Sequence, residues 1–362
     1  MGKKRVGILF GGKSGEHEVS LISGASVYTH IDTSIFTPIL IGVDFDGRWY
    51  LQAPPRLDEE ENSLVLQRDE KNLVSLLPGA GLAAGGSSLD LEVVFPVLHG
   101  TFGEDGTVQG LLEVAHVPYV GAGVLGSSLG MDKGVVKKIW LHEGLATVPF
   151  VECEHYDFLR EGGPQRLIDL AVECFGYPLF VKPSRAGSSV GVARAENPEE
   201  LKKAMTEAFR FDTKLLIEPE IRGREVECSV TGNEEVRAYA VGEIVPSHEF
   251  YDYEAKYLDP EGAELRIPAP IDEKLLLKVR EIAAAAYRAA EAEGFARLDF
   301  FIREDGTILL NEINTIPGFT HISMFPKLCD HAGLGYRDLI THLIELGLDR
   351  FAAKDSLLYR RS

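Results

Sequence analysis

Two predicted strands near the C-terminus carry the strongest chemical signal in the sequence. Residues 296–318 read ARLDFFIREDGTILLNEINTIPG, which predicts two strands joined by a turn at REDG. Side chains alternate across a strand, so Arg297 shares a face with Asp299, and Glu312 shares a face with Asn314. If the strands pair, Asp299, Glu312 and Asn314 form a cluster of hard oxygen ligands suited to Mg²⁺ and nucleotide phosphates. Two solvated strand faces are the alternative.

A loop rich in glycine and serine follows another predicted strand. The segment VKPSRAGSSVGV places Lys182 at the end of the strand and Gly187, Ser188 and Ser189 in the loop. Small residues let backbone N–H groups approach phosphate oxygens closely, and Lys182 adds a positive charge. The spacing matches neither a Walker A loop nor a Rossmann fingerprint, and an ordinary surface turn is the alternative.

Two more segments are candidates for nucleotide contacts. Lys133 begins a predicted helix, with Asp132 as a possible cap, and a solvated lysine is the alternative. In LIEPEIRGREVE, Glu218 ends a predicted strand and Pro219 offers a carbonyl without an N–H. Pro219 and Ile221 could supply the C=O and N–H that an adenine edge needs, and an ordinary strand or helix edge is an equal alternative.

Two glycine-containing segments of the N-terminal part, GGKSGEHEVS and LHGTFGEDGTVQG, also follow predicted strands. Open α/β sheets bind ligands at the carboxyl ends of their strands, so Glu16 and His99 are candidate substrate contacts. Helix capping by Ser14 and Glu16 and a hydrogen-bonded structural role for His99 are the alternatives.

The elements that must position these residues alternate between strands and helices. A strand at 6–12, a helix at 19–31 and strands at 37–43 and 91–98 predict an α/β unit with a parallel sheet. Residues 54–88 predict surface hairpins and loops, and the segment 121–140 leads into the amphipathic helix that begins at Lys133. Further strands are expected at 179–184, 189–195, 214–221, 296–303 and 307–315, and further helices at 198–209, 273–294 and 336–351.

Length and composition limit the classes of protein to consider. The chain has 362 residues, of which 45% are hydrophobic, and 37 Lys plus Arg against 56 Asp plus Glu give a net charge of −19. These values predict two or three folded domains and argue against a general binder of nucleic acid or of an anionic membrane. Four widely spaced cysteines without a CxxC motif indicate a cytoplasmic protein rather than a disulfide framework or a zinc site.

In chain order, the motifs resemble the D-alanine:D-alanine ligases of the ATP-grasp superfamily. The resemblance runs from residue 6 to about residue 346 and is carried by GGKSGEHEVS, HGTFGEDGTVQG, MDK, VKPSRAGSSVGV, IEPEIRGREVE, FYDYEAKYLDP, ARLDFF and LNEINTIPGFT. It implies an α/β fold, α+β in the ATP-binding part: an N-terminal parallel-sheet domain (1–121), a central ATP-grasp subdomain (122–219) and a C-terminal one (220–362). The implied reaction joins two D-alanines through a D-alanyl phosphate and releases ADP and phosphate, for peptidoglycan precursor synthesis.

The resemblance also implies roles for individual residues. Those matched to ATP are Lys133 and Lys182 at the phosphates and Glu218, Pro219, Ile221 and Glu225 at the adenine and ribose. Those matched to two Mg²⁺ ions, with Mn²⁺ as a possible substitute, are Asp299, Glu312 and Asn314. Arg297 and the Gly318 amide match groups that steady the transferred phosphoryl and the oxyanion. Those matched to the amino acids are Glu16, His99, Ser188 and Tyr257 for the first D-alanine and Lys256, Ser323 and Met324 for the second. Pro219 stands where other members carry lysine, and Met324 where many carry leucine.

Two rival functions remain open at this level. One is a ligase of the same fold that joins D-alanine to D-lactate or D-serine, against which Tyr257 within EAKYLDP favours D-alanine as the nucleophile. The other is an ATP-binding protein without catalysis, against which the complete set of matched residues argues. The resemblance further implies a homodimer, with D-alanine and ATP as the small-molecule partners.

Overall fold

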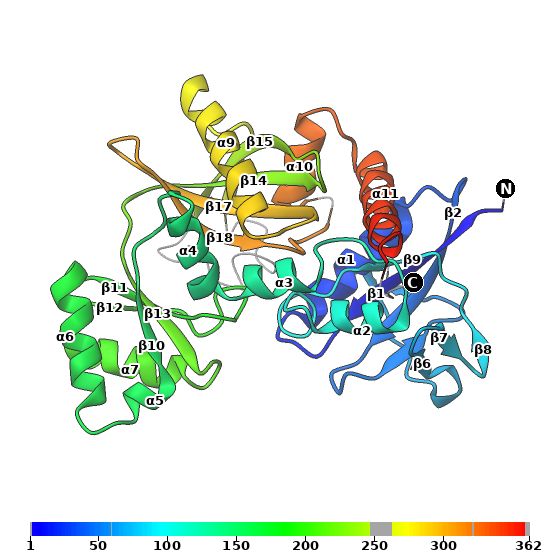
Figure 1. Cartoon of the computed structure of the whole chain (residues 1–362), viewed down its shortest axis with the longest axis horizontal. Helices are drawn as coiled ribbons and strands as arrows, with labels where there is room; N and C mark the ends of the chain where they lie inside the picture. The colour runs from blue at the N-terminus through cyan, green and yellow to red at the C-terminus, as the bar shows by residue number, and fades with distance from the viewer. Residues whose placement is uncertain (1, 59, 247–262, 321, 359–362) are drawn as a thin grey trace.

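The computed structural model describes residues 2–58, 60–246, 263–320 and 322–358. Figure 1 shows three layered parts, with the N-terminal strands at one end, the central strands and helices at the other, and a third sheet between and above them. The last helix returns to the N-terminal end, where it lies beside the first sheet. The mixed α/β character expected from the alternating elements is confirmed.

The N-terminal sheet has the order β3-β2-β1-β9, and β1 (Lys4–Gly11) pairs in parallel with β2 (Phe36–Val43) and β9 (Val93–Pro96). β3 (Trp49–Leu51) is antiparallel to β2. The helices of this part are α1 (His17–His30) and α2 (Thr107–Ala115). As expected, small hairpins occupy the segment before β9: β4 (Leu57–Asp58), β5 (Ser63–Leu64), η1 (Glu70–Asn72), β6 (Val74–Leu77), β7 (Gly81–Ala84) and β8 (Ser87–Ser88).

The helix expected to begin at Lys133, with Asp132 as its cap, is confirmed, and a further helix precedes it. α3 (Val124–Met131) ends at Asp132, and α4 (Lys133–His142) begins directly after it. Asp132 has an extended backbone (φ −88°, ψ 92°), and its carboxylate accepts a hydrogen bond of 3.1 Å from the Val135 amide. Because capping needs this non-helical backbone, Asp132 separates the two helices and caps the second one.

The central sheet is antiparallel, with the order β10-β13-β11-β12. Its strands are β10 (Val151–Glu154), β11 (Leu179–Pro183), β12 (Ala193–Ala195) and β13 (Lys214–Pro219), and its helices are α5 (His155–Phe158), α6 (Gly163–Phe175) and α7 (Pro198–Ala208). The strand expected at 189–195 begins only at residue 193. Ser188 and Ser189 have φ values of 48° and 59°, which lie outside the β region, so the preceding residues form a loop.

The third sheet is also antiparallel, with the order β16-β15-β14-β17-β18. The strands are β14 (Gly223–Gly232), β15 (Arg237–Pro246), β16 (Ala263–Arg266), β17 (Gly294–Arg303) and β18 (Ile308–Asn314), and the helices are α9 (Glu273–Ala289), α10 (Met324–His331) and α11 (Tyr336–Asp355). The predicted turn between the last two strands is confirmed, with the Gly306 amide donating to the Arg303 carbonyl at 2.9 Å. α9 ends before the expected residue 294, because β17 begins there.

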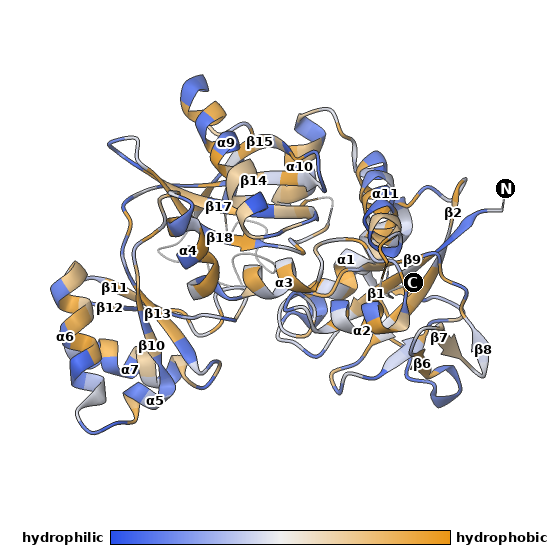
Figure 2. Ribbon diagram, viewed as in Figure 1, coloured by the Kyte–Doolittle hydropathy of each residue, from blue (hydrophilic) through white to orange (hydrophobic). Residues whose placement is uncertain are grey.

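Aromatic packing joins the first sheet to the third. The ring of Phe95 on β9 lies 5.6 Å from the ring of Phe319, and Phe295 on β17 lies 5.3 Å from Phe325 on α10. All four side chains are buried in one core with residues of α1 and α11. Figure 2 shows the corresponding pattern on the helices, where α6 and α9 alternate between hydrophilic and hydrophobic residues. Among the described residues, no helix is both long and apolar enough to cross a bilayer.

Candidate active site

Two cavities meet where the three sheets face one another. The larger one has a volume of about 900 Å³ and lies between the central sheet and the third sheet. The smaller one has a volume of about 560 Å³ and is lined mainly by residues of the first and third parts, together with Gly187 and Ser188 of the central part. Ser188, Ile244 and Glu312 line both cavities, so a group bound in one cavity can reach a group bound in the other.

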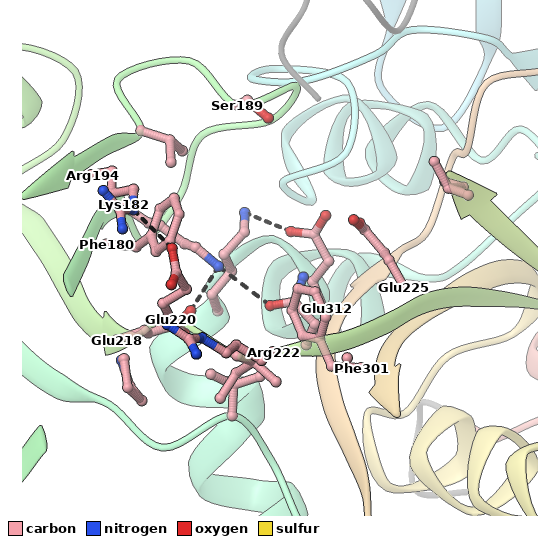
Figure 3. Close-up of a pocket in the computed structure, with 18 of the residues that line it drawn as sticks. Phe180, Lys182, Ser189, Arg194, Glu218, Glu220, Arg222, Glu225, Phe301 and Glu312 are labelled. Carbon is pink, nitrogen blue, oxygen red and sulfur yellow. Dashed lines mark hydrogen bonds and ion pairs between the residues drawn. The ribbon is translucent and has the colours of Figure 1, made fainter. Parts of the chain in front are cut away.

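Lys182 and Glu218 form the inner wall of the larger cavity (Figure 3). Strand pairing places Phe180 of β11 opposite Glu218 of β13, so Lys182, two residues further along β11, is a diagonal neighbour of Glu218. The Nζ atom of Lys182 lies 2.7 Å from Glu218 Oε2 and 3.4 Å from Asn311 Oδ1. Burial alone would lower the pKa of Lys182, but the Glu218 carboxylate outweighs burial and raises it. Lys182 is therefore a fixed positive charge.

Lys133 also lines the larger cavity and contacts the segment that carries the glycine-serine loop. Its Nζ atom donates a hydrogen bond of 2.8 Å to the Ala186 carbonyl and lies 3.3 Å from Glu312 Oε2. The alternative of a solvated lysine is wrong, because the side chain is only 15% exposed. The ordinary surface turn is also disfavoured for the glycine-serine loop, since Ser188 and Ser189 line the larger cavity.

The rest of the predicted nucleotide contacts line the same cavity. Pro219 is the last residue of β13, and the chain passes through Ile221 before β14 begins at Gly223. Glu225 follows on β14 and also lines the cavity (Figure 3). The Pro219 carbonyl and the Ile221 amide, which are expected to contact an adenine, thus lie in the connection between the two sheets.

The oxygen cluster predicted from the two C-terminal strands converges. Pairing of β17 with β18 places Asp299 opposite Glu312 and Arg297 opposite Asn314. The Nδ2 atom of Asn314 donates to Asp299 Oδ2 at 3.1 Å, and the Arg297 guanidinium donates to both Asp299 oxygens at 2.7 Å. Solvated strand faces are excluded as the alternative, because Asp299 is only 3% exposed.

The donor set fits magnesium. The described residues contain no group of three or more His, Cys, Asp or Glu side chains arranged as metal ligands. The candidate site instead combines the carboxylates of Asp299 and Glu312 with the amide oxygen of Asn314. Mg²⁺ is commonly held by one or two carboxylates together with substrate phosphates and water, so this small set matches its chemistry. Arg297 and Lys133 balance the charge of the two carboxylates.

Glu16 and Ser188 meet at the smaller cavity. The Ser188 hydroxyl donates a short hydrogen bond to Glu16 Oε1, although the two residues are 172 positions apart. Gly100 and Gly187 both approach this carboxylate, since a Cβ atom at either position would lie 2.4 or 2.6 Å from Glu16 Oε2. The two glycines therefore leave room for an acid that is 7% exposed and faces a cavity.

His99 lines the smaller cavity, but both of its ring nitrogens have protein partners. Nδ1 lies 2.9 Å from the Ile316 carbonyl, and Nε2 lies 2.9 Å from the Ser23 hydroxyl. Burial would lower the pKa of His99, but Glu104, 3.8 Å away, raises it above its usual value. These contacts favour the alternative in which His99 holds the cavity wall together.

Gly318, Ser323 and Met324 line the far side of the smaller cavity. Ser323 precedes α10, and its hydroxyl accepts a hydrogen bond of 3.1 Å from the Thr320 amide. Met324 is the first residue of α10, so its amide lies at the positive end of the helix dipole. Lys256 and Tyr257 lie outside the described residues.

Three further residues of the site were not predicted from the sequence. Asn311 contacts Lys182, Lys137 contacts Glu218, and Glu104 faces His99. Burial raises the pKa of Glu104 to about 7. Only Lys137 had a usable signal in the sequence, because it stands four residues after Lys133 and therefore on the same helical face.

Two family models match most of the chain. Residues 5–122 match the family model described as the D-ala D-ala ligase N-terminus, and residues 139–345 match the one described as its C-terminus. The chain belongs to the D-alanine–D-alanine ligase family.

Relatives within this family cover nearly all of the chain. The chain is 48% identical to the D-alanine–D-alanine ligase of Treponema denticola, with 96% of each chain covered. It is 43% identical to D-alanine–D-alanine ligase A of Escherichia coli K12, with 99% of each covered. Among solved structures, the D-alanine-D-alanine ligase of Coxiella burnetii superposes with a TM-score of 0.81 at 33% identity, covering 98% of this chain and 97% of that one. The D-Ala:D-Ser ligase VanG of Enterococcus faecalis superposes with a TM-score of 0.84 at 35% identity, covering 96% and 100%.

Proposed function

We propose that this D-alanine–D-alanine ligase family member joins two D-alanine molecules in an ATP-dependent reaction that proceeds through a D-alanyl phosphate. The observation that carries the proposal is the junction of the two cavities at Ser188 and Glu312. ATP in the larger cavity and an amino acid in the smaller one would meet at this junction. A phosphoryl group could then pass between them without leaving the protein.

The residues of the larger cavity fit the parts of ATP. Lys133 and Lys182 would bind the phosphates, because both are largely buried positive charges on the cavity wall. The adenine would lie at the connection from β13 to β14, between the Pro219 carbonyl and the Ile221 amide. Glu218 and Glu225 would contact the adenine and ribose sides.

Asp299, Glu312 and Asn314 would hold Mg²⁺ ions, for which Mn²⁺ is a possible substitute. We propose two ions, which when bound supply positive charge to the phosphates during transfer. Arg297 lies beside this set, 2.7 Å from Asp299, and would steady the negative charge on the moving phosphoryl group.

In the first step, a carboxylate oxygen of the first D-alanine attacks the γ-phosphorus, and the bond to the leaving ADP breaks. Glu16 would bind the ammonium group of this D-alanine, with Ser188 fixing the carboxylate of Glu16. A carboxylate is a poor electrophile, so this activation is required before an amide bond can form.

In the second step, the deprotonated amine of the second D-alanine attacks the acyl carbon. The Gly318 amide would stabilise the oxyanion of the tetrahedral intermediate, from which phosphate leaves. The carboxylate of the second D-alanine would bind at the start of α10, near Ser323 and the Met324 amide, because helix N-termini favour anions. From the sequence, Lys256 is expected near that carboxylate and Tyr257 near Glu16.

One of the similar solved structures is a D-Ala:D-Ser ligase, so D-serine is the specific alternative for the second substrate. The test is ADP release by the purified protein with Mg-ATP, comparing D-alanine, L-alanine, D-serine and D-alanine with D-lactate, with each product identified by mass. D-alanine-dependent ADP release with D-alanyl-D-alanine as the product is expected. Turnover with a different pair would move the substrate assignment, and no turnover with any pair would contradict the proposal.

Three further parts of the hypothesis depend on the resemblance in sequence. They are the division of the chain near residues 121 and 220, the homodimer and the cytoplasmic location. Sedimentation of the purified protein tests the dimer directly, with a mass of twice 39.8 kDa expected.

A further inference from the structure

A buried lysine lies behind the wall of the larger cavity. Lys137 on α4 is fully buried, one helical turn after Lys133. Its Nζ atom pairs with Glu218 and lies 3.4 Å from the Val148 carbonyl and 5.7 Å from the centre of the Phe150 ring. Lys137 is not among the described residues that line either cavity, so it would not touch a bound nucleotide itself.

Glu218 connects this lysine to the cavity. Its Oε1 atom pairs with Lys137, and its Oε2 atom lies 2.7 Å from Lys182, which does line the cavity. Lys137, Glu218 and Lys182 thus form a row of three charges, called here the buried charge row. Glu218 is only 1% exposed, so its charge is compensated by these two lysines rather than by water.

The charges of the three residues in the row determine the net positive charge at the cavity wall. With two lysines and one carboxylate, the row has a net charge of +1, and Lys182 at its open end presents it to the cavity. If Lys137 were neutral, Glu218 and Lys182 would cancel. The remaining carboxylate would also draw the Lys182 ammonium toward itself, because opposite charges attract strongly where water is scarce.

We propose that Lys137 is a positioning residue for ATP, acting through Glu218 to hold Lys182 at the cavity wall as an uncompensated positive charge. The inference is built on the proposed function, since it takes the polyphosphate of ATP as the group that Lys182 meets. A purely structural ion pair is the competing explanation, and it predicts a loss of stability without a selective effect on ATP.

The experiment compares Lys137→Met and Lys137→Arg with the wild type. Lys138→Met is the matched control, because Lys138 is adjacent on α4 but is 55% exposed and pairs with Glu152 at 2.8 Å. Steady-state ADP release is measured against Mg-ATP at saturating D-alanine, and against D-alanine at saturating Mg-ATP. The Kd for Mg-ATP is measured by calorimetry, and each melting temperature is recorded.

For Lys137→Met we expect the KM and Kd for Mg-ATP to rise about tenfold or more, with the KM for D-alanine within about twofold of the wild type. Lys137→Arg keeps the charge and should restore the ATP constants to within about threefold, and Lys138→Met should leave all of them unchanged. If Lys137→Met does not fold, Lys137→Gln takes its place, since it keeps a donor to Glu218 without the charge.

Unchanged ATP constants in a destabilised Lys137→Met or Lys137→Gln variant would overturn the inference and leave a structural ion pair. Equal losses for ATP and D-alanine would overturn it as well. A wild type that binds Mg-ATP but shows no D-alanine-dependent turnover would contradict the proposed function instead. The Kd values would still decide the role of Lys137 in that case.

Discussion

Asn311 and Glu312 are neighbours on β18, yet both line the larger cavity. In a regular strand, adjacent side chains point to opposite faces. Here the pairing with β17 shifts, since Asp299 lies opposite Glu312 while Phe300 lies opposite Leu310. Asn311 is therefore the extra residue of a β-bulge. The bulge turns Asn311 toward Lys182 while Glu312 keeps its place among the candidate metal ligands.

This relationship predicts a selective effect of Asn311→Ala on ATP. Loss of the contact to Lys182, 3.4 Å in length, should raise the KM for Mg-ATP about fivefold, in line with about 1 kcal/mol for one hydrogen bond. The kcat should change less than the KM. Steady-state ADP release against Mg-ATP checks this, and an unchanged KM would show that the contact has no part in ATP binding.

Glu312→Gln should reduce kcat by about a hundredfold or more, because removing a carboxylate from a candidate Mg²⁺ site weakens charge stabilisation of the phosphoryl group. The concentration of Mg²⁺ needed for half-maximal rate should also increase. Glu304→Gln, on the exposed turn between the same two strands, is the control. An unaltered Mg²⁺ dependence in Glu312→Gln would exclude Glu312 as a ligand.

Glu16→Gln should raise the KM for D-alanine by about thirtyfold, because a charged hydrogen-bond partner contributes about 2 kcal/mol or more. Ser188→Ala should have a smaller effect in the same direction, since Ser188 acts through Glu16. Glu18→Gln, an exposed acid on the first turn of α1, is the control. The KM for Mg-ATP should stay unchanged in Glu16→Gln. A rise in the KM for Mg-ATP alone would contradict the assignment of Glu16 to the D-alanine site.

The buried pair of Glu104 and His99 predicts a pH-dependent stability. Burial raises the pKa of Glu104 to about 7, and Glu104 holds the pKa of His99 above its usual value. The folded protein binds both protons more tightly than the unfolded chain. Both groups therefore stabilise it at low pH, and the Glu104 contribution is lost as the pH rises from about 4.5 to about 7.

Glu104→Gln removes the Glu104 part of this dependence. As the pH rises from 5 to 8, the wild type should lose about 1–3 kcal/mol more free energy of unfolding than the variant does. Denaturant unfolding at several pH values measures the difference. A pH profile parallel to that of the wild type would show that Glu104 does not titrate in this range.

Tyr257, which lies outside the described residues, predicts the choice of nucleophile. The resemblance in sequence takes Tyr257 as the residue that favours D-alanine as the nucleophile. Tyr257→Phe should therefore shift the product from D-alanyl-D-alanine toward D-alanyl-D-lactate when both nucleophiles are present. Mass spectrometry of the products at several pH values measures the ratio. A constant ratio would remove Tyr257 from the specificity of the site.

Local periodicity determined much of this protein from the sequence. Alternation along two strands placed Asp299, Glu312 and Asn314 together, and the turn between the strands was recognisable from its residues. The apolar run at the start of the chain predicted the parallel strand β1. The glycine-serine loop lines the larger cavity, and its contact with phosphate stays a prediction. These features follow from backbone geometry over a few residues, which any sequence displays directly.

Tertiary structure decided the contacts between distant segments. The bulge at Asn311 depends on how β17 pairs with β18. The cap at Asp132 was predictable, but its ion pair of 2.5 Å with Lys214 was not. The buried charge row unites α4, β11 and β13, and Glu16 meets Ser188 across 172 positions. Such contacts arise from the packing of separate elements, and that packing has no period in the sequence from which it could be predicted.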